Sequence, residues 1–376
     1  MGTDIQYDYD TVIIGAGPAG ATLARRLATQ KRNILLIDGS TQQGEKLCGG
    51  LLSPDAQDLL AAYDIAIPNH VLSSPQLFSV RVLDLAHPQT RHYRRSYMNV
   101  DRGKFDALLR SLVPDTVSVL SGICRTVRRK NGGFTLLVKT DGGEQTISCR
   151  YLVGADGAAS VVRKCLFPHK RITRYVALQQ QFPAGDENPY YSCIFDPKTS
   201  PSCSWIFFKD GRLVFGGAFE KKGCRSAFEA QKRKLIARGT VPEQVMAAPL
   251  ETRACAVLRP GFFRGICHGK DGAYLIGEAA GFISPSSLEG ISYALASAEA
   301  LYQAFSGAES DKRILRLYKS RSAGLFWKIK LKCLKRPFMY LPPLRALILK
   351  TGIGSMQIKR DSTANNPNKT FSGGTL

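Results

Sequence analysis

The fold is decided by residues 10–38, which read DTVIIGAGPAGATLARRLATQKRNILLID. Residues 10–14 form a short apolar run typical of a buried strand, and residues 15–20 form a GxGxxG turn. Apolar residues at helical spacing over 21–30 predict a helix, and a second buried strand over 34–37 ends at Asp38. Such a succession of strand, glycine turn, helix, strand and acid within about thirty residues predicts a dinucleotide-binding unit.

Each glycine of the turn has its own expected role. Gly15 permits the tight turn, Gly17 lets the backbone approach a pyrophosphate, and Gly20 lets the helix pack closely on the strand. The free N–H groups at the start of the helix favour a phosphate. Asp38 is placed to accept hydrogen bonds from an adenosine ribose. The alternative interpretation is that these glycines serve only the turn.

Three later segments also combine glycine with apolar or acidic residues. Residues 46–52 (KLCGGLL) suit a loop that lies against a flat ring, because adjacent glycines allow close backbone approach. Residues 151–157 (YLVGADG) form an apolar strand that ends in Asp156 and Gly157. Residues 273–281 (AYLIGEAAG) repeat this pattern before a helix expected over 292–305. Composition alone does not bring these segments together.

The composition limits the remaining possibilities. A chain of 376 residues corresponds to two or three folding units. The net charge of +22 favours anionic partners, and residues 311–360 contain fourteen of the basic residues and one acid. The ten cysteines lack CxxC or CxH spacing, so we expect no metal site and no disulfide framework. Residues 1–10 do not resemble a signal peptide, and no stretch reaches the about 18 apolar residues of a membrane span, so we expect a cytoplasmic protein.

Taken as a set, the motifs resemble those of a flavoprotein family. The N-terminal GxGxxG, the central Gly-Ala-Asp-Gly and the late Gly-Glu-Ala-Ala-Gly-Phe resemble the FAD-binding fold of para-hydroxybenzoate hydroxylase. The Lys-x-Cys-Gly-Gly loop at 46–50 and Gly-Phe-Ile-Ser-Pro at 281–285 are similar to the geranylgeranyl reductase family. The resemblance implies an α/β fold, FAD as cofactor and NAD(P)H as a transient electron donor. The cofactor-binding residues that it implies are Gly15, Ala16, Gly17, Ala19, Gly20, Asp38, Lys46, Gly49, Gly50, Arg102, Asp156, Gly157, Gly277, Glu278, Pro285, Gly290 and Ile291.

The resemblance also assigns individual roles. Asp156 would lie near the cofactor and a passing NAD(P)H, Glu278 near the ribityl and phosphate part, and Arg102 near the flavin. The turn over 285–291 would pass beside the flavin ring, where backbone N–H groups can stabilise negative charge. Two residues depart from the family pattern: Glu278 replaces the usual aspartate, and Leu288 stands where many relatives have glycine.

The substrate side is expected in residues 203–217. Trp205 and Phe207 match a prenyl reductase signature, whereas Cys203 and Phe208 replace its tyrosine and proline. Alternation along a strand places Cys203, Trp205 and Phe207 on one face, as a wall for a long apolar ligand. The alternative is that these side chains simply fill a sheet core.

Cys48 is the candidate catalytic residue. The two glycines after it could bring its sulfur close to the flavin, to donate a proton or to position the substrate. The alternative is an inert buried thiol. The five histidines show no metal or triad spacing and receive no role.

The basic segment from Lys312 to Lys335 alternates Lys and Arg with apolar residues and predicts one amphipathic basic helix. Such a helix suits peripheral contact with an anionic membrane, and its alternative is a solvated helix packed on the nucleotide-binding domain. Nucleic acid is a less favoured partner, because no DNA- or RNA-binding module accompanies the charge.

The sequence thus predicts an FAD-binding domain over 1–75, 98–168 and 268–305, and a mainly β-sheet substrate domain over 76–97 and 169–267. A basic helical region over 306–361 and a disordered tail over 362–376 follow. The expected function is reduction of carbon–carbon double bonds in an isoprenoid lipid by an FAD-dependent oxidoreductase. Two alternatives remain: an aromatic monooxygenase using NAD(P)H and oxygen, and a non-catalytic flavin-binding protein of membrane surfaces or regulation.

Overall fold

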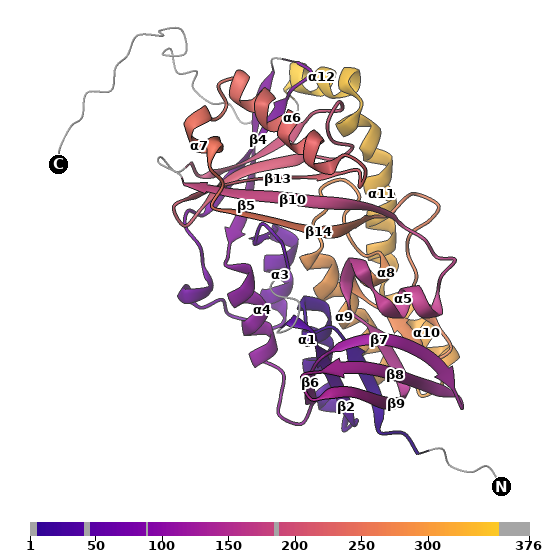
Figure 1. The fold of residues 1–376 in the computed structure, drawn as a ribbon. Helices are drawn as coiled ribbons and strands as arrows, with labels where there is room; N and C mark the ends of the chain where they lie inside the picture. Colours follow the sequence, from indigo (N-terminus) through magenta and orange to yellow (C-terminus); the bar gives the residue numbers. More distant parts are fainter. Residues whose placement is uncertain (1–5, 41–45, 88, 184–187, 353–376) are drawn as a thin grey trace.

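The computed structural model describes residues 6–40, 46–87, 89–183 and 188–352, which form two sheets with helices around them (Figure 1). The predicted α/β class is confirmed. The tail over 362–376 lies outside the described residues. None of the helices in the described part of the chain is long and apolar enough to cross a membrane.

The first sheet contains the strand, turn and helix predicted from residues 10–38. Its strands, in spatial order, are β15 (Gly269–Lys270), β16 (Ala273–Leu275), β9 (Gly143–Gly154), β1 (Tyr9–Ile14), β2 (Ile34–Asp38) and β6 (Ser118–Ser121), while β8 (Gly133–Thr140) pairs with β9 and β7 (Ile123–Lys130) pairs with β8. β1 runs parallel to β2 and β9, with Val12 opposite Leu35 and Leu152. All three side chains are buried, as expected for a parallel sheet covered on both faces.

Two helices that follow glycine-containing segments, α1 (Pro18–Leu27) and α9 (Ile291–Ser306), pack against each other beside the first sheet. α1 begins with a proline, which fits the first helical turn because its missing N–H would have no partner there. α9 begins directly after Gly290. α3 (Pro54–Ala62) and α8 (Gly277–Ala280) also pack on α9, α4 (Arg102–Ser111) packs on α1, and α5 (Val161–Leu166) packs on β7 and β9.

The second sheet lies above the first in Figure 1 and is mainly antiparallel. Its strands, in spatial order, are β14 (Glu251–Arg259), β10 (Thr173–Pro183), β13 (Arg212–Phe219), β12 (Ser204–Lys209), β11 (Tyr190–Phe195), β4 (Leu77–Asp84), β5 (Thr90–Asn99) and β3 (Leu51–Leu52). On the outer face, Phe215 and Phe219 pack on Phe228 of α6 (Cys224–Ala237), and α7 (Glu243–Ala247) follows α6. β3 comes from the segment that the sequence assigned to the FAD-binding domain, and the proposed domain boundaries stay predictions.

The prediction of one basic helix between Lys312 and Lys335 is wrong. The segment forms α10 (Asp311–Arg321) and α11 (Ala323–Tyr340), and Ser322 separates them. The Ser322 hydroxyl donates to the Tyr318 carbonyl oxygen at 2.6 Å, so a side chain competes for the carbonyl groups at the end of α10. α10 packs on α9, whereas α11 runs alongside both sheets (Figure 1).

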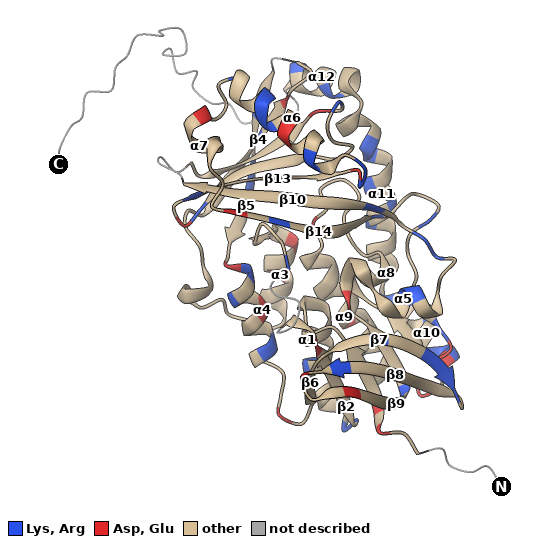
Figure 2. Ribbon diagram, in the orientation of Figure 1, with Lys and Arg blue, Asp and Glu red and all other residues tan. Residues whose placement is uncertain are grey.

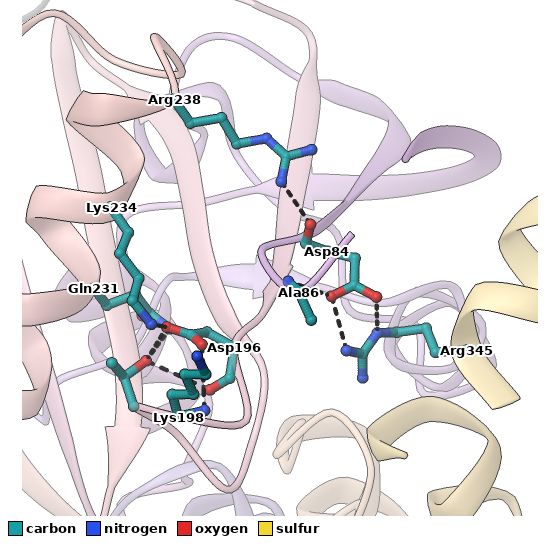
Figure 3. Close-up of polar contacts among 9 residues, drawn as sticks. Asp84, Ala86, Asp196, Lys198, Gln231, Lys234, Arg238 and Arg345 are labelled. Carbon is teal, nitrogen blue, oxygen red and sulfur yellow. Dashed lines mark hydrogen bonds and ion pairs between the residues drawn. The ribbon is translucent and has the colours of Figure 1, made fainter. Parts of the chain in front are cut away.

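A buried ion pair fastens the last helix, α12 (Pro342–Thr351), to the second sheet. Arg345 donates from Nε and Nη2 to the two carboxylate oxygens of Asp84, at 2.8 Å each (Figure 3). The Asp84 side chain is fully buried and that of Arg345 is 4% exposed. The two parallel hydrogen bonds set both the position and the orientation of α12.

Candidate active site

The GxGxxG turn has one glycine with open space and two that are enclosed by backbone. A Cβ atom on Gly15, whose φ is +103°, would lie 2.7 Å from the carbonyl oxygen of Ala155. A Cβ on Gly20 would lie only 1.8 Å from the carbonyl oxygen of Gly15. A Cβ on Gly17 would meet nothing within 4 Å. Gly15 and Gly20 are therefore required for packing, while Gly17 leaves room for a ligand.

The surroundings of Gly17 suit a phosphate group. Gly17 is the N-cap of α1, and no side chain caps this helix end. The first N–H groups of a helix lack partners within the helix and attract anions. Ala16 and Ala19 are buried and keep the turn close to the core. These residues fit the pyrophosphate of a dinucleotide.

Asp38 lies beside this turn at the end of β2. The neighbouring Ile37 carbonyl accepts a hydrogen bond from the Gly15 N–H at 2.9 Å, which places both strand ends at one edge of the sheet. The Asp38 carboxylate accepts from the Ser40 N–H at 2.9 Å and lies 3.5 Å from the Arg110 Nε. Its contact with an adenosine ribose stays a prediction.

The three glycine and acid segments converge, as the resemblance implied. Ala155, directly before Asp156, lies against Gly15, and a Cβ on Gly277 would lie 3.1 Å from the Cβ of Ala19. A Cβ on Gly157 would lie 3.7 Å from the Nζ of Lys46. The GxGxxG turn, the 46–50 loop and the segments around Asp156 and Gly277 therefore lie together, although the outermost of them are more than 250 residues apart in sequence.

The two later acids have partners within the protein. Asp156 accepts hydrogen bonds from the Val161 and Val162 N–H groups at the start of α5, and burial raises the pKa of this carboxyl. Glu278 accepts from Lys46 Nζ at 2.7 Å and from the Leu258 N–H at 2.9 Å. Glu278 in turn raises the pKa of Lys46. Both carboxylates hold the segments together, and their contacts with FAD or NAD(P)H stay predictions.

The loop over residues 46–50 lies between the two sheets. The Leu47 carbonyl oxygen is 3.8 Å from the Cys255 sulfur of β14, and Lys46 pairs with Glu278 of α8. Gly50 has a φ of +67°, and a Cβ there would lie 2.2 Å from the carbonyl oxygen of Val100. Only glycine fits this position, because both the backbone conformation and the close approach exclude a side chain.

Cys48 lies in a positively charged part of this loop. Arg102, at the start of α4, is close enough to the Cys48 sulfur to lower the pKa of that thiol, and it also pairs with Asp106 at 2.8 Å. Burial by itself would raise the pKa of the Cys48 thiol, but Arg102, the Gly50 N–H and Lys46 outweigh burial and lower that pKa. A thiol with a lowered pKa is a better proton donor and a more available thiolate than an ordinary buried cysteine.

Lys209 is a site residue that the sequence reasoning missed. Its Nζ, at the end of β12, donates to the carbonyl oxygens of Gly49 at 2.6 Å and Val100 at 2.7 Å. Burial lowers the pKa of Lys209 to about 8, against the opposing effect of Cys48. Lys209 lies within the segment 203–217 that predicts the substrate side, but the apolar alternation of this strand carries no signal for a buried lysine.

Trp205 and Phe207 of β12 lie on the face of the sheet opposite to Ile206 and Phe208, and Phe207 contacts the loop. Phe207 is buried, and a Cβ on Gly49 would lie 3.2 Å from its ring. Trp205 donates from Nε1 to Gln179 at 3.1 Å. Ile206 lies in the core on the outer face of the sheet, so the predicted alternation along this strand is observed.

Cys203 lies near the turn that follows α8. Its sulfur is 3.9 Å from the carbonyl oxygen of Ser286. The neighbouring Cys193 and Tyr340 side chains, together with the charge of Arg259, lower the pKa of the Cys203 thiol against the opposing effect of burial. The three predicted substrate residues thus line the same side of the sheet, and their contact with a substrate stays a prediction.

The turn over residues 285–291 keeps a glycine-like conformation without glycine at its centre. Leu288 has a φ of +56°, in the left-handed region that favours glycine. The loop is held by Arg259, which donates to the Pro285 carbonyl oxygen at 2.9 Å, and by Tyr340, which donates to the Ser286 carbonyl oxygen at 2.5 Å. The turn therefore keeps its conformation although leucine replaces glycine at position 288. The hydrogen bonds from Arg259 and Tyr340 offset the strain of the left-handed backbone at Leu288.

Comparisons with known proteins agree with this architecture. Residues 10–183 match the family model of lycopene cyclase proteins. A geranylgeranyl bacteriochlorophyll reductase-like protein from Thermoplasma acidophilum superposes with a TM-score of 0.75 and 18% identity, covering 93% of this chain and 92% of that one. A probable FAD-dependent monooxygenase from Pseudomonas aeruginosa superposes with a TM-score of 0.68 and 17% identity, covering 91% of this chain and 99% of that one. The fold is therefore the one shared by FAD-dependent reductase-like and monooxygenase proteins.

A closer relationship follows from the sequence comparison. The chain is 40% identical over 358 residues to protein CbrA of Escherichia coli O6:H1, which covers 94% of this chain and 96% of that protein. The chain belongs to the CbrA protein family.

Proposed function

We propose that the chain is an FAD-dependent oxidoreductase that reduces carbon–carbon double bonds of an isoprenoid lipid. The observation that carries this proposal is the loop over residues 46–50, which holds Cys48, a thiol with a lowered pKa, and in which a Cβ on Gly49 would lie 3.2 Å from the Phe207 ring of β12. Gly17 and the start of α1 would hold the pyrophosphate, Asp38 the ribose, and residues 46–50 and 285–291 the ring. When bound, FAD supplies the hydride, after reduction by a donor such as NAD(P)H.

Cys48 is the proposed proton donor. An isolated alkene that receives hydride at one carbon must gain a proton at the neighbouring carbon, so reduction needs an acid beside the bond. The Cys48 S–H bond would break and its proton would move to that carbon, leaving a thiolate. Arg102 and Lys46 stabilise the thiolate, and solvent returns the proton. Trp205 and Phe207 would hold the apolar chain and exclude water.

The test starts with the purified full-length protein, its absorption spectrum and the mass spectrum of co-purified lipid. Under anaerobic conditions, the reduced protein should convert a geranylgeranyl lipid into a product with two more hydrogens per reduced bond. A Cys48→Ser variant should retain FAD and the lipid but lose at least about tenfold in rate. A preparation that stays colourless in excess FAD overturns the proposal.

A second candidate is aromatic hydroxylation with NAD(P)H and oxygen, which is favoured by the shared fold with the Pseudomonas aeruginosa monooxygenase. Consumption of oxygen in step with aromatic substrate, independent of Cys48, would select this activity. Tight flavin binding without turnover of either substrate class would select a non-catalytic flavin-binding role.

A further inference from the structure

Helix α11 leaves a continuous apolar stripe uncovered. Spacings of four, three and four residues place Trp327, Leu331, Leu334 and Phe338 on one helical face, and Leu341 follows at the end of the helix. Each of these side chains is at least half exposed: Trp327 (63%), Leu331 (58%), Leu334 (56%), Phe338 (53%) and Leu341 (50%). Large apolar side chains aligned in this way differ from the scattered exposed residues that are normal on a protein surface.

The stripe is not needed for packing α11 onto the protein. Ile329 and Cys333 are buried on the opposite face of the helix, and the Cys333 sulfur is 3.7 Å from the Pro260 carbonyl oxygen. The stripe is extended by the loop after β14, where Phe263 is 90% exposed. Lys330 joins the two parts, because its Nζ lies 5.0 Å from the ring centroid of Phe262.

The charges on α11 itself have one sign, and one of its lysines, Lys328, pairs with Asp55 of α3 at 2.7 Å. α11 contains Lys328, Lys330, Lys332, Lys335 and Arg336 and no acidic residue. Figure 2 shows Lys and Arg, without Asp or Glu, along this helix. Lys335 is exposed, and the long stems of Lys330 and Lys335 allow their charged ends to reach beyond the apolar side chains.

We infer that this face, the α11 stripe with Phe263 and its flanking lysines, docks on the surface of an anionic phospholipid bilayer. An apolar stripe would enter the boundary between headgroups and acyl chains, while the lysines contact the anionic headgroups. The charge favours this occupant, because a second copy of the same cationic face would repel it.

Docking would place the membrane next to the proposed active site. Tyr340 of α11 donates to Ser286 in the turn over 285–291, and the Nζ of Lys332 lies 5.2 Å from the Tyr293 ring centroid in α9. The same helix therefore contacts lipid on one face and the flavin-side turn on the other. Entry of a lipid substrate from the bilayer rests on the proposed function, whereas docking itself does not.

Sedimentation of the full-length protein with vesicles tests the docking. Vesicles with one-third phosphatidylglycerol should bind the protein, phosphatidylcholine vesicles should bind it weakly, and added salt should release it. The double variant Leu331→Ser/Leu334→Ser should bind at least about tenfold more weakly. Leu250→Ser is the matched control, because Leu250 is similarly exposed (57%) but lies away from the stripe. Leu250 precedes the first residue of β14, whereas the loop with Phe263 follows the last residue of that strand.

A spectroscopic measurement separates docking from misfolding and from lipid turnover. The chain has two tryptophans, and only Trp327 is in the stripe, so vesicle binding should shift the emission of Trp327 to shorter wavelength. A Trp327→Phe variant should lose that shift. Equal binding of the double variant and Leu250→Ser, or stripe variants that convert a dimer into a monomer, would overturn the inference. Because no substrate or electron donor is added, failure of docking is distinct from failure of the proposed reaction.

Discussion

Gly17 and Gly20 lie three residues apart in one turn, yet a side chain added to each would meet opposite surroundings. At Gly20 the nearest atom is the Gly15 carbonyl oxygen, 1.8 Å from an ideal Cβ. Neither partner can move away, because both belong to the backbone of the same tight turn. An ideal Cβ on Gly17 would have no atom of the rest of the described protein within 4 Å.

This contrast predicts different defects. Gly17→Val should change the free energy of unfolding by only about 1 kcal/mol, through the N-cap position, but should weaken FAD binding at least tenfold. Gly20→Ala should cost about 1–3 kcal/mol or more, because the turn must open to admit the methyl group. Chemical denaturation and flavin fluorescence titration measure the two effects. A stable Gly20→Ala variant with normal FAD affinity would contradict the geometry.

The lowered pKa of Cys48 depends on Arg102, which is distant in sequence, and on two neighbours in its own loop. Arg102, the Gly50 N–H and Lys46 favour the thiolate, and their combined effect exceeds that of burial. Removing the charge of Arg102 should therefore raise the pKa of Cys48, because burial would then act with less opposition. The thiolate fraction near neutral pH falls about tenfold for each unit by which the pKa rises.

Alkylation by iodoacetamide, followed at the Cys48 peptide by mass spectrometry, tests this effect. The rate for the Arg102→Gln variant should reach its plateau at higher pH than the rate for the unchanged protein. Alkylation of the exposed Cys165 serves as the internal reference and should not change. In the proposed reaction the protonated thiol is needed, so the reduction rate should fall as the pH rises through the lowered pKa. An unshifted profile in Arg102→Gln would remove Arg102 from this role.

At the scale of elements, the buried ion pair of Asp84 and Arg345 holds α12, together with hydrogen bonds from Arg91 of β5 to the Leu349 and Lys350 carbonyl oxygens. Asp84→Asn would leave the Arg345 guanidinium without its charged partner in a site where that side chain is 4% exposed. Loss of one partner of a buried pair typically costs about 3–5 kcal/mol. The exposed pair of Lys270 and Asp271 is the control, since Asp271→Asn should cost less than about 1 kcal/mol. Urea denaturation compares the two, and equal losses would show that the Asp84 pair does not fasten α12.

Elements were predictable where the pattern was local. The strands and helix of residues 10–38 follow from a short buried run, a glycine turn and helical spacing, all within neighbouring residues. The basic segment from Lys312 to Lys335 contains no glycine or proline at the break at Ser322, so periodicity alone predicted one helix. Packing of Ile314 and Tyr318 on the core decided the direction of α10 instead.

At the scale of the whole molecule, the proposed cofactor site joins several separate segments. Residues of β1, α1, β2, the 46–50 loop, the end of β9 and α8 contribute to it. A ligand that bridges these segments should stabilise the entire folded state. At a free FAD concentration of about 100 times Kd, binding should add about 2.7 kcal/mol to the free energy of unfolding.

Differential scanning calorimetry of the flavin-free protein, with and without FAD, measures this stabilisation. The midpoint should rise by several degrees, and Gly17→Val should abolish most of the rise. Adenosine alone should produce a smaller shift, because it contacts only one end of the site. No shift at saturating FAD would contradict a bridging cofactor.

The glycine turn, the strand ends with their acids and the candidate Cys48 could be predicted from the sequence, because they depend on backbone preferences and spacing over a few residues, whereas Arg102 was implied by the family resemblance. Only the tertiary structure decided that Lys209 reaches the Gly49 loop, that Arg102 lies against the Cys48 sulfur, and which face of α11 stays uncovered. Charge interactions and burial act between atoms brought together by long-range packing, so no local pattern records them.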